Sequence, residues 1–267
     1  MQLVQSHSSK FSWQTLPWQQ FAPWLIPAAL IVLWQILAQI GIISTRILPA
    51  PTQIVEAAIR LALSGELVRN VVVSLYRALA GFLIGGSIGL SLGVLNGLAR
   101  RAELLLDSSI QMIRNIPHLA LIPLVILWFG IGDSARIFLV SLGVFFPIYI
   151  NTFAGIRSID PNLLEMGRVY GLSRKQLFSQ IVLPGALPNM LVGLRYALGL
   201  MWLTLIVAET IAANSGIGYM AMNAREFMQT DVVVMSILLY ALLGKLADSI
   251  VRTLERWWLP WHPSQQG

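Results

Sequence analysis

Uncharged apolar runs of about 20 residues recur along this chain of 267 residues. A helix needs about that length to cross the hydrocarbon core of a bilayer, and in lipid a helix satisfies its own backbone polar groups. The pattern therefore predicts an all-α polytopic membrane protein. We expect its spanning helices at roughly 21–40, 71–99, 109–130, 135–156, 187–212 and 231–252.

The segment between the first two runs, residues 44–70, is too polar to cross a membrane. Pro51 suits the first turn of a helix, and Gly65 suits the position just after one. Between them, apolar residues recur with a helical period at Ile54, Ala57, Ala58 and Leu61. We predict a short amphipathic helix that lies on the membrane surface.

A second polar segment, residues 157–186, separates the fourth run from the fifth. Asp160 is a good N-cap, and Pro161 suits the first helical position. Gly171 is typical of the left-handed residue that ends a helix. These signals predict a helix that starts at Pro161 and stops at Gly171.

A second short helix is expected directly afterwards. Ser173 and Gln176 have the spacing of a capping box, in which each residue satisfies the backbone N–H of the other. Pro184 and Pro188 are expected to break this helix before the chain re-enters the membrane.

Such short helices are marginal in water and need a surface to pack on. The residues alone leave two interpretations open. The segment is either an ordinary loop on the bilayer surface or a docking element for a cytoplasmic partner. In the second case Gly167 would allow close approach, and Tyr170 would be an anchor.

Composition supports the membrane assignment. Hydrophobic residues make up 56% of the chain and charged residues 11%, whereas about a quarter of a soluble domain is charged. Lys and Arg gather in the polar segments, so the net charge of +6 indicates membrane orientation rather than nucleic-acid binding. Their excess on one side places both termini and segment 157–186 in the cytoplasm. We expect a cytoplasmic tail at 1–20, a permease domain at 21–256 and a C-terminal tail at 257–267.

The second predicted span carries a glycine at every fourth position. Small residues at this spacing let helices approach closely in membranes. The stripe drifts around the helix by about 40° per step, so we expect several neighbouring helices to share it. The glycines are Gly81, Gly85, Gly89, Gly93 and Gly97.

The sequence offers little catalytic chemistry. It has no cysteine. His118 follows Pro117, at an expected kink of the third predicted span, and has no second metal ligand at a suitable spacing, so we expect it to pack through a hydrogen bond. No phosphate-binding loop occurs, because Gly244-Lys245 lacks both the earlier glycine and the following hydroxyl. We predict neither an enzyme nor a cofactor. Glu209 is expected to hold a neighbouring helix or loop, and Lys245 to pair with Asp248.

The loop at residues 213–226 contains three residues, Ser215, Gly216 and Gly218, that can bend sharply. The loop is either a simple turn between spans or, on the outer side, a contact for a periplasmic binding protein or an outer gate. The sequence leaves these alternatives open.

One spacing carries a family resemblance. Glu165, Gly171, Ile181 and Leu183-Pro184 resemble the signature cytoplasmic loop of ATP-binding-cassette (ABC) importer permeases, although Met166-Gly167 stands where that family usually has two alanines. The resemblance implies that this loop is the coupling helix that seats in a groove of the ATPase subunit. The residues it implicates are Glu165, Met166, Gly167, Tyr170, Gly171, Leu172, Ile181 and Pro184.

The resemblance extends over most of the chain. The stretches RNIPHLALIPLVILWFGIGDSARIF and GLMWLTLIVAETIAANSGIGYMAMNAREFMQTDVVV are similar to permeases of aliphatic sulfonate importers. This similarity implies a type I importer permease fold in the bacterial inner membrane. It also implies as partners a second copy of the chain, two ATPase subunits and a periplasmic sulfonate-binding protein. Import of taurine, nitrate, bicarbonate or another small anion is the alternative. An ATP-independent carrier would favour inverted repeats, and the sequence has none.

Overall fold

The computed structural model describes residues 18–261, and every regular element in that range is helical. The predicted tail at 1–20 and the end of the tail predicted at 257–267 therefore lie largely outside the described residues. The elements are α1 (Trp18–Gln39), α2 (Pro51–Leu63), α3 (Glu66–Leu98), α4 (Arg100–Arg114), η1 (His118–Leu121), α5 (Ile122–Phe129), α6 (Asp133–Arg157), α7 (Pro161–Val169), α8 (Arg174–Leu177), η2 (Phe178–Val182), α9 (Leu183–Ala212), α10 (Ile217–Glu226) and α11 (Thr230–Trp258).

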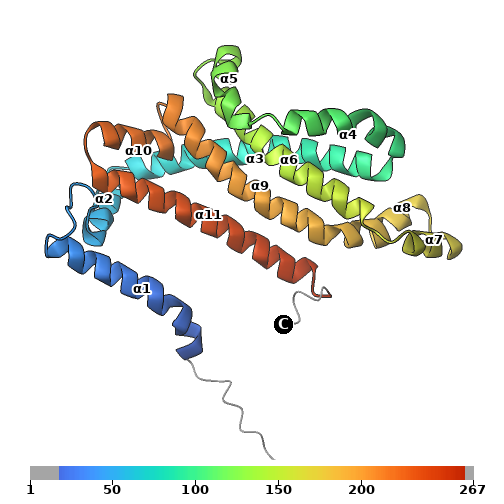
Figure 1. The fold of residues 1–267 in the computed structure, drawn as a ribbon, viewed down its shortest axis with the longest axis horizontal. Helices are drawn as coiled ribbons and strands as arrows, with labels where there is room; N and C mark the ends of the chain where they lie inside the picture. The colour runs from blue at the N-terminus through green and yellow to red at the C-terminus, as the bar shows by residue number, and fades with distance from the viewer. Residues whose placement is uncertain (1–17, 262–267) are drawn as a thin grey trace, which may run out of the picture.

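Four long helices, α3, α6, α9 and α11, form the body of the molecule (Figure 1). Helix α6 packs against both α3 and α9, and α11 packs against α9. The short helices gather at the two ends: α7 and α8 lie at one end, and α2 and α10 lie at the other (Figure 1). The all-α prediction is confirmed, and the two polar segments lie at opposite ends of the bundle.

Four helices in the described range are long and apolar enough to cross a membrane. They are α3, α6, the continuous helix Arg174–Ile211 and α11, and they coincide with four predicted spans. The described apolar part of α1, Trp24–Gln39, is shorter than a full span. The predicted count of six spans therefore stays a prediction.

The span predicted at 109–130 is broken at Pro117, where a kink is expected, and the break is sharp. Helix α4 ends at Arg114, the helical chain resumes at His118, and the two parts are bent by 78°. The cause lies at Pro117, which has no backbone N–H to donate and disfavours helical geometry in the residue before it. Counting the bent pair as one span gives at most five in the described range.

The glycine stripe of α3 faces a single helix, α6, along its whole length. A Cβ atom on Gly81 would lie 2.5 Å from Val140, and one on Gly97 would lie 2.8 Å from Ile156. The three glycines between them meet α6 at Ser141, Phe145, Ile148, Tyr149 and Thr152. The prediction that several helices share the stripe is wrong, because a partner that winds with the stripe stays in contact with it. Such close approach is what small residues permit in membranes.

Helix α2 forms where the sequence predicts it, between Pro51 and Gly65. Its apolar side does not rest on lipid alone. Ile54 and Ala57 are buried in the main core, in the same cluster as Val232 and Met235 of α11. The amphipathic pattern is therefore satisfied largely by the bundle.

Candidate functional site

The polar segment at 157–186 folds as the predicted pair of short helices. Asp160 Oδ1 accepts a hydrogen bond of 2.8 Å from the backbone N–H of Asn162, at the start of α7. The Ser173 N–H donates to Gln176 Oε1 at 2.9 Å, and the Gln176 N–H donates to Ser173 Oγ at 3.4 Å. Both caps satisfy donors that the first turn of a helix leaves free. The cap predictions are confirmed.

The turn between α7 and α8 depends on Gly171. Its φ of +78° lies in the left-handed region, where a residue without a Cβ is favoured. The Leu172 N–H donates to the Gly167 carbonyl at 3.0 Å, which closes the end of α7. The predicted stop at Gly171 is confirmed, and the angle between the two helices is set by hydrogen bonds.

The prediction that Pro184 and Pro188 break the second helix is wrong. Residues 174–211 form one continuous helix of 38 residues. Pro184 is accommodated because the preceding turn, η2, is a π-helix in which the Leu183 N–H donates to the carbonyl of Phe178. A proline cannot donate to the turn before it, and the wider turn leaves room for its ring. The polar segment is thus joined to the membrane span without a hinge.

Gly167 faces the interior of this pair of helices. It is buried, and a Cβ atom there would lie 2.8 Å from Ile181 Cδ1 and 3.3 Å from Leu172 Cδ1. The close approach that Gly167 allows is therefore between α7 and the α8–η2 helix of the same chain. Leu172 and Ile181 are half-buried on this inner side, and Pro184 is half-buried further along the same continuous helix.

The exposed surface of α7 is largely apolar. Leu163 and Met166 are about half exposed, and Val169 and Tyr170 are 81% and 80% exposed. Glu165 and Gly171 are exposed beside them. The residues that the family motif singles out thus divide into an inward set, which holds α7 in place, and an outward set, which is available to a partner.

The other end of the bundle contains a buried polar network centred on Glu209 of α9. Its carboxylate accepts hydrogen bonds from Arg77 Nη1 at 2.8 Å, from Ser74 Oγ at 2.8 Å and from Tyr240 Oη at 3.0 Å. The backbone N–H of Gly218 also donates to it, at 3.0 Å. Four donors from α3, α10 and α11 therefore converge on one buried carboxylate. The prediction that Glu209 holds a neighbouring helix or loop is confirmed.

Arg77 is the second hub of this network. Its Nε donates to Asp133 Oδ1 at 2.8 Å, which ties α3 to the first residue of α6. Its Nη1 donates to the Ser215 carbonyl at 2.7 Å, and its Nη2 donates to Ser215 Oγ at 2.9 Å. A buried charge is costly unless it is paired and hydrogen-bonded, and both conditions are met here.

The loop that holds Ser215, Gly216 and Gly218 is clamped to α3 by its own backbone. The Gly216 N–H donates to Asn70 Oδ1 at 2.9 Å, and the N–H of the next residue donates to Ser74 Oγ at 2.8 Å. Gly216 has a φ of +108°, and a Cβ atom there would collide with the Glu209 carboxylate. Both glycines are buried and Ser215 is half-buried, so this loop is an ordered part of the bundle.

Sequence reasoning missed Arg77 and the hydroxyl and amide groups around it. The available signal was that Arg77 and Glu209 are opposite charges within apolar segments, where ionisable residues usually pair with one another. Asn70, Ser74 and Tyr240 gave no comparable signal, because single polar residues are common near the ends of spans.

The remaining polar predictions concern isolated residues. His118 Nε2 lies 3.0 Å from Thr204 Oγ1, in agreement with the predicted packing role. Lys245 Nζ lies 3.7 Å from Asp248 Oδ2, and Asp248 also pairs with Arg195 and Arg252. In the part of the chain that the structure describes, no cluster of three metal-ligating side chains occurs.

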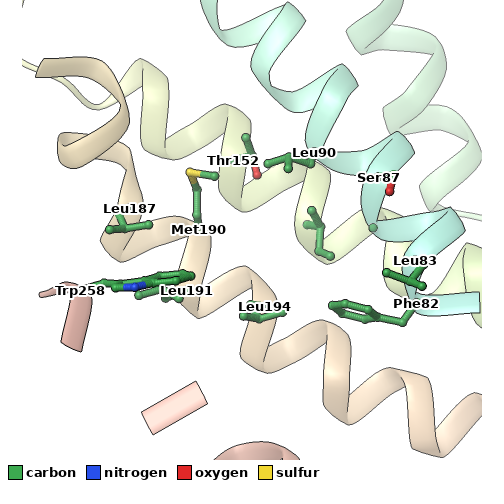
Figure 2. A pocket seen from close by; sticks show the side chains of 12 residues that line it. Phe82, Leu83, Ser87, Leu90, Thr152, Leu187, Met190, Leu191, Leu194 and Trp258 are labelled. Carbon is green, nitrogen blue, oxygen red and sulfur yellow. The ribbon is translucent and has the colours of Figure 1, made fainter. Parts of the chain in front are cut away.

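A cavity of about 280 Å³ lies within the bundle between α3, α6 and α9, with Trp258 of α11 at one edge (Figure 2). Ser87 and Thr152 are the hydroxyl groups among largely apolar neighbours such as Phe82 and Met190 (Figure 2). None of the described residues that line it is charged. The cavity therefore suits an apolar group and offers no cation for an anionic substrate.

Residues 81–259 match the family described as binding-protein-dependent transport system inner membrane component. The chain is 64% identical over 243 residues to the Escherichia coli (strain K12) protein assigned as the aliphatic sulfonates transport permease SsuC, covering 91% of this chain and 92% of that one. It is 35% identical over 244 residues to the taurine transport system permease TauC of the same organism, covering 90% and 89%.

A solved structure shares the fold. The crystal structure of an amino acid ABC transporter with histidines superposes with a TM-score of 0.61 at 16% sequence identity. The likeness covers 74% of this chain and 97% of that one. At 16% identity this likeness shows a shared fold and nothing further.

Proposed function

The chain belongs to the family of binding-protein-dependent transport system inner membrane components, and from this premise we propose that it is the permease of an importer for aliphatic sulfonates. It is a multi-pass protein of the inner membrane. The proposed substrate class is supported by 64% identity to the sulfonate permease, against 35% identity to the taurine permease.

Growth on defined sulfur sources tests this substrate class. Deleting the gene for this chain is expected to abolish growth on ethanesulfonate as the sole sulfur source and to leave growth on taurine and on sulfate intact. Loss of growth on taurine alone would assign the chain to taurine import. Unchanged growth on every sulfonate, combined with lost uptake of nitrate or bicarbonate, would move it to those substrates.

Energy for transport comes, in this proposal, from a separate ATPase subunit that binds the outward side of α7. The observation that carries this mechanism is the continuity of the helix from Arg174 to Ile211. Helix α7 packs onto it through Gly167 and Ile181, so a displacement of α7 reaches the membrane span directly. At 1.5 Å per residue this helix is about 57 Å long, which exceeds the thickness of the hydrocarbon core. The chain itself lacks a phosphate-binding loop, so the proposal assigns ATP hydrolysis to the partner subunit.

The substrate pathway is proposed to lie between two copies of the chain. The cavity inside one copy, between α3, α6 and α9, has no cationic lining residue among those described and therefore does not suit an anionic sulfonate. This supports a pathway outside the single bundle. Two copies would pair with two ATPase subunits, and alternating access would follow from movement of the two α7 helices. Cross-linking of single-cysteine variants in a cysteine-free chain measures this arrangement directly.

The end opposite α7 is proposed to receive the periplasmic binding protein. Ser215, Gly216 and Gly218 contribute as a rigid support rather than as direct contacts, because both glycines are buried by their own chain. Asn214 is exposed beside them and is available to a partner. The Glu209 network would keep this docking surface in register with the spans that move.

A further inference from the structure

A cavity of about 740 Å³ lies where α3 and α6 end and the polar pair α7 and α8 begins. Three arginines line it, one from the end of α6, one from α7 and one from α8. The rest of the lining is mainly apolar and includes Ile156, Leu164 and Phe178. We call this cavity the arginine pocket, and its three arginines are Arg157, Arg168 and Arg174.

The arginine pocket lies on the opposite side of α7 from the apolar face described above. Pro161, Leu164 and Arg168 line the pocket, at a spacing that places them on one side of the helix. Leu163, Met166 and Tyr170 have the same spacing, shifted by two residues, which corresponds to a rotation of about 200°. A partner that covers the apolar face therefore leaves the pocket accessible from the other side.

Two of the three arginines carry uncompensated charge. Arg157 Nη2 lies 3.1 Å from Glu103 Oε2, so its charge is neutralised locally. Arg168 and Arg174 are both exposed, and no carboxylate of residues 24–261 lies within 4.0 Å of either guanidinium. The pocket thus combines two available cations with an apolar floor, and that combination favours an amphiphile with an anionic group.

The pocket also lies at a suitable depth for a lipid. Gly97 and Leu98, in the last turn of α3, line it together with Ile156, in the last turn of α6. Apolar spans end where acyl chains give way to headgroups, so we expect the floor beside acyl chains and the arginines at the level of phosphates. Basic pockets between membrane helices are known to hold anionic headgroups, and a guanidinium can donate two parallel N–H bonds to phosphate oxygens.

We propose that the arginine pocket binds an anionic phospholipid, with its phosphate held by Arg168 and Arg174 and the start of an acyl chain on the apolar floor. This site goes beyond the proposed transport function and does not depend on the substrate. A lipid is favoured over an acidic segment of the ATPase because the floor is continuous with the ends of two membrane spans, on the side of α7 that faces away from the apolar surface.

Lipid adducts on the full chain test the proposal. The purified, delipidated protein is mixed with equal amounts of phosphatidylglycerol and phosphatidylcholine of identical acyl chains, and adducts are measured by native mass spectrometry. We expect phosphatidylglycerol to bind at least about tenfold more tightly, which corresponds to about 1.4 kcal/mol. Both lipids carry the phosphate, but phosphatidylcholine also brings a cationic choline group close to Arg168 and Arg174, whereas phosphatidylglycerol keeps a net negative charge. The double variant Arg168→Gln/Arg174→Gln is expected to lose this preference.

The matched control is the double variant Lys175→Gln/Arg256→Gln. It removes two exposed cations, one next to Arg174 and one near the end of α11, and neither residue lines the pocket. Its preference for phosphatidylglycerol should equal that of the wild type. The variant Arg168→Lys/Arg174→Lys keeps both charges and should keep part of the preference.

Several results would overturn the proposal. Equal binding of the two lipids by the wild type would do so without any variant, and so would an equal loss of preference in the control variant. Displacement of the lipid by inorganic phosphate at similar concentration would indicate a site for free anions. Loss of ATPase copurification in Arg168→Gln/Arg174→Gln, with unchanged lipid adducts, would assign the arginines to the ATPase contact.

Discussion

Arg77 of α3 and Glu209 of α9 form an ion pair of 2.8 Å although 132 residues separate them in the chain. Both side chains are fully enclosed, with exposed fractions of 1% and 0%. The pair joins two spans and, through Ser215 and Gly218, fixes the loop before α10. This arrangement makes the end of the bundle opposite α7 a single unit whose stability depends on a few buried polar groups.

Removing the carboxylate of Glu209 should strongly destabilise the protein. Glu209→Ala leaves Arg77, Ser74 and Tyr240 without their shared acceptor, and breaking a buried ion pair from one side costs about 3–5 kcal/mol. Denaturant titration in detergent measures this change in the free energy of unfolding. Glu226→Ala, which removes an exposed carboxylate from α10, is the matched control and should remain near wild-type stability.

The ion pair itself is tested by a double-mutant cycle. Arg77→Ala/Glu209→Ala should cost less than the sum of the two single substitutions, because the double variant leaves neither buried charge unpaired. Additive effects would mean that the two side chains contribute independently, and the description of the network would then be wrong.

Gly216→Ala should destabilise the loop before α10. The φ of +108° is strained for any residue with a Cβ, and the added methyl group would meet the Glu209 carboxylate. Gly199→Ala is the control, because Gly199 lies in α9 with open space around its Cα and should gain helix propensity of up to about 1 kcal/mol. The two alanine substitutions are therefore expected to shift the unfolding midpoint in opposite directions. Shifts of the same sign would contradict the claim that Gly216 is required by its backbone conformation and its contact with Glu209.

Gly171→Val should weaken the turn between α7 and α8 and uncouple transport. The left-handed conformation costs a residue with a Cβ about 1–2 kcal/mol, and Val is β-branched as well. Asn tolerates this conformation, so Gly171→Asn should retain uptake in proteoliposomes that also contain the ATPase and the binding protein. Wild-type uptake and normal ATPase binding in the Val variant would show that the turn geometry does not matter for coupling.

Tyr170→Ala should weaken binding of the ATPase without changing the stability of the chain. Tyr170 is 80% exposed, so its removal leaves the packing of α7 intact. An aromatic anchor at the centre of an interface contributes about 2 kcal/mol or more, which corresponds to roughly a 30-fold loss of affinity. Copurification with the ATPase measures this loss. Tyr76→Ala, which removes a tyrosine that is 59% exposed on α3, should have no effect on it.

Local sequence signals were reliable where the interaction itself is local. The caps at Asp160 and Ser173 and the left-handed turn at Gly171 involve residues within a few positions of one another, and all three occur as predicted. Four of the predicted spans are equally clear, because the requirement for about 20 apolar residues is a property of one segment. The prediction that Pro184 breaks the helix was wrong because the π-turn before it leaves room for the proline ring. No feature of the sequence predicted that turn.

From the sequence alone it follows that this chain is a helical membrane protein, that the polar segment 157–186 folds as two short helices, and where the caps of those helices lie. Three features could be seen only in the tertiary structure: α6 follows the whole glycine stripe of α3, Gly167 packs against Ile181 of the same chain, and Arg77 pairs with Glu209. The physical reason is the range of the interactions. Hydrogen bonds within a turn and transfer into lipid depend on neighbouring residues, whereas helix partners and buried ion pairs depend on how distant segments wind around each other.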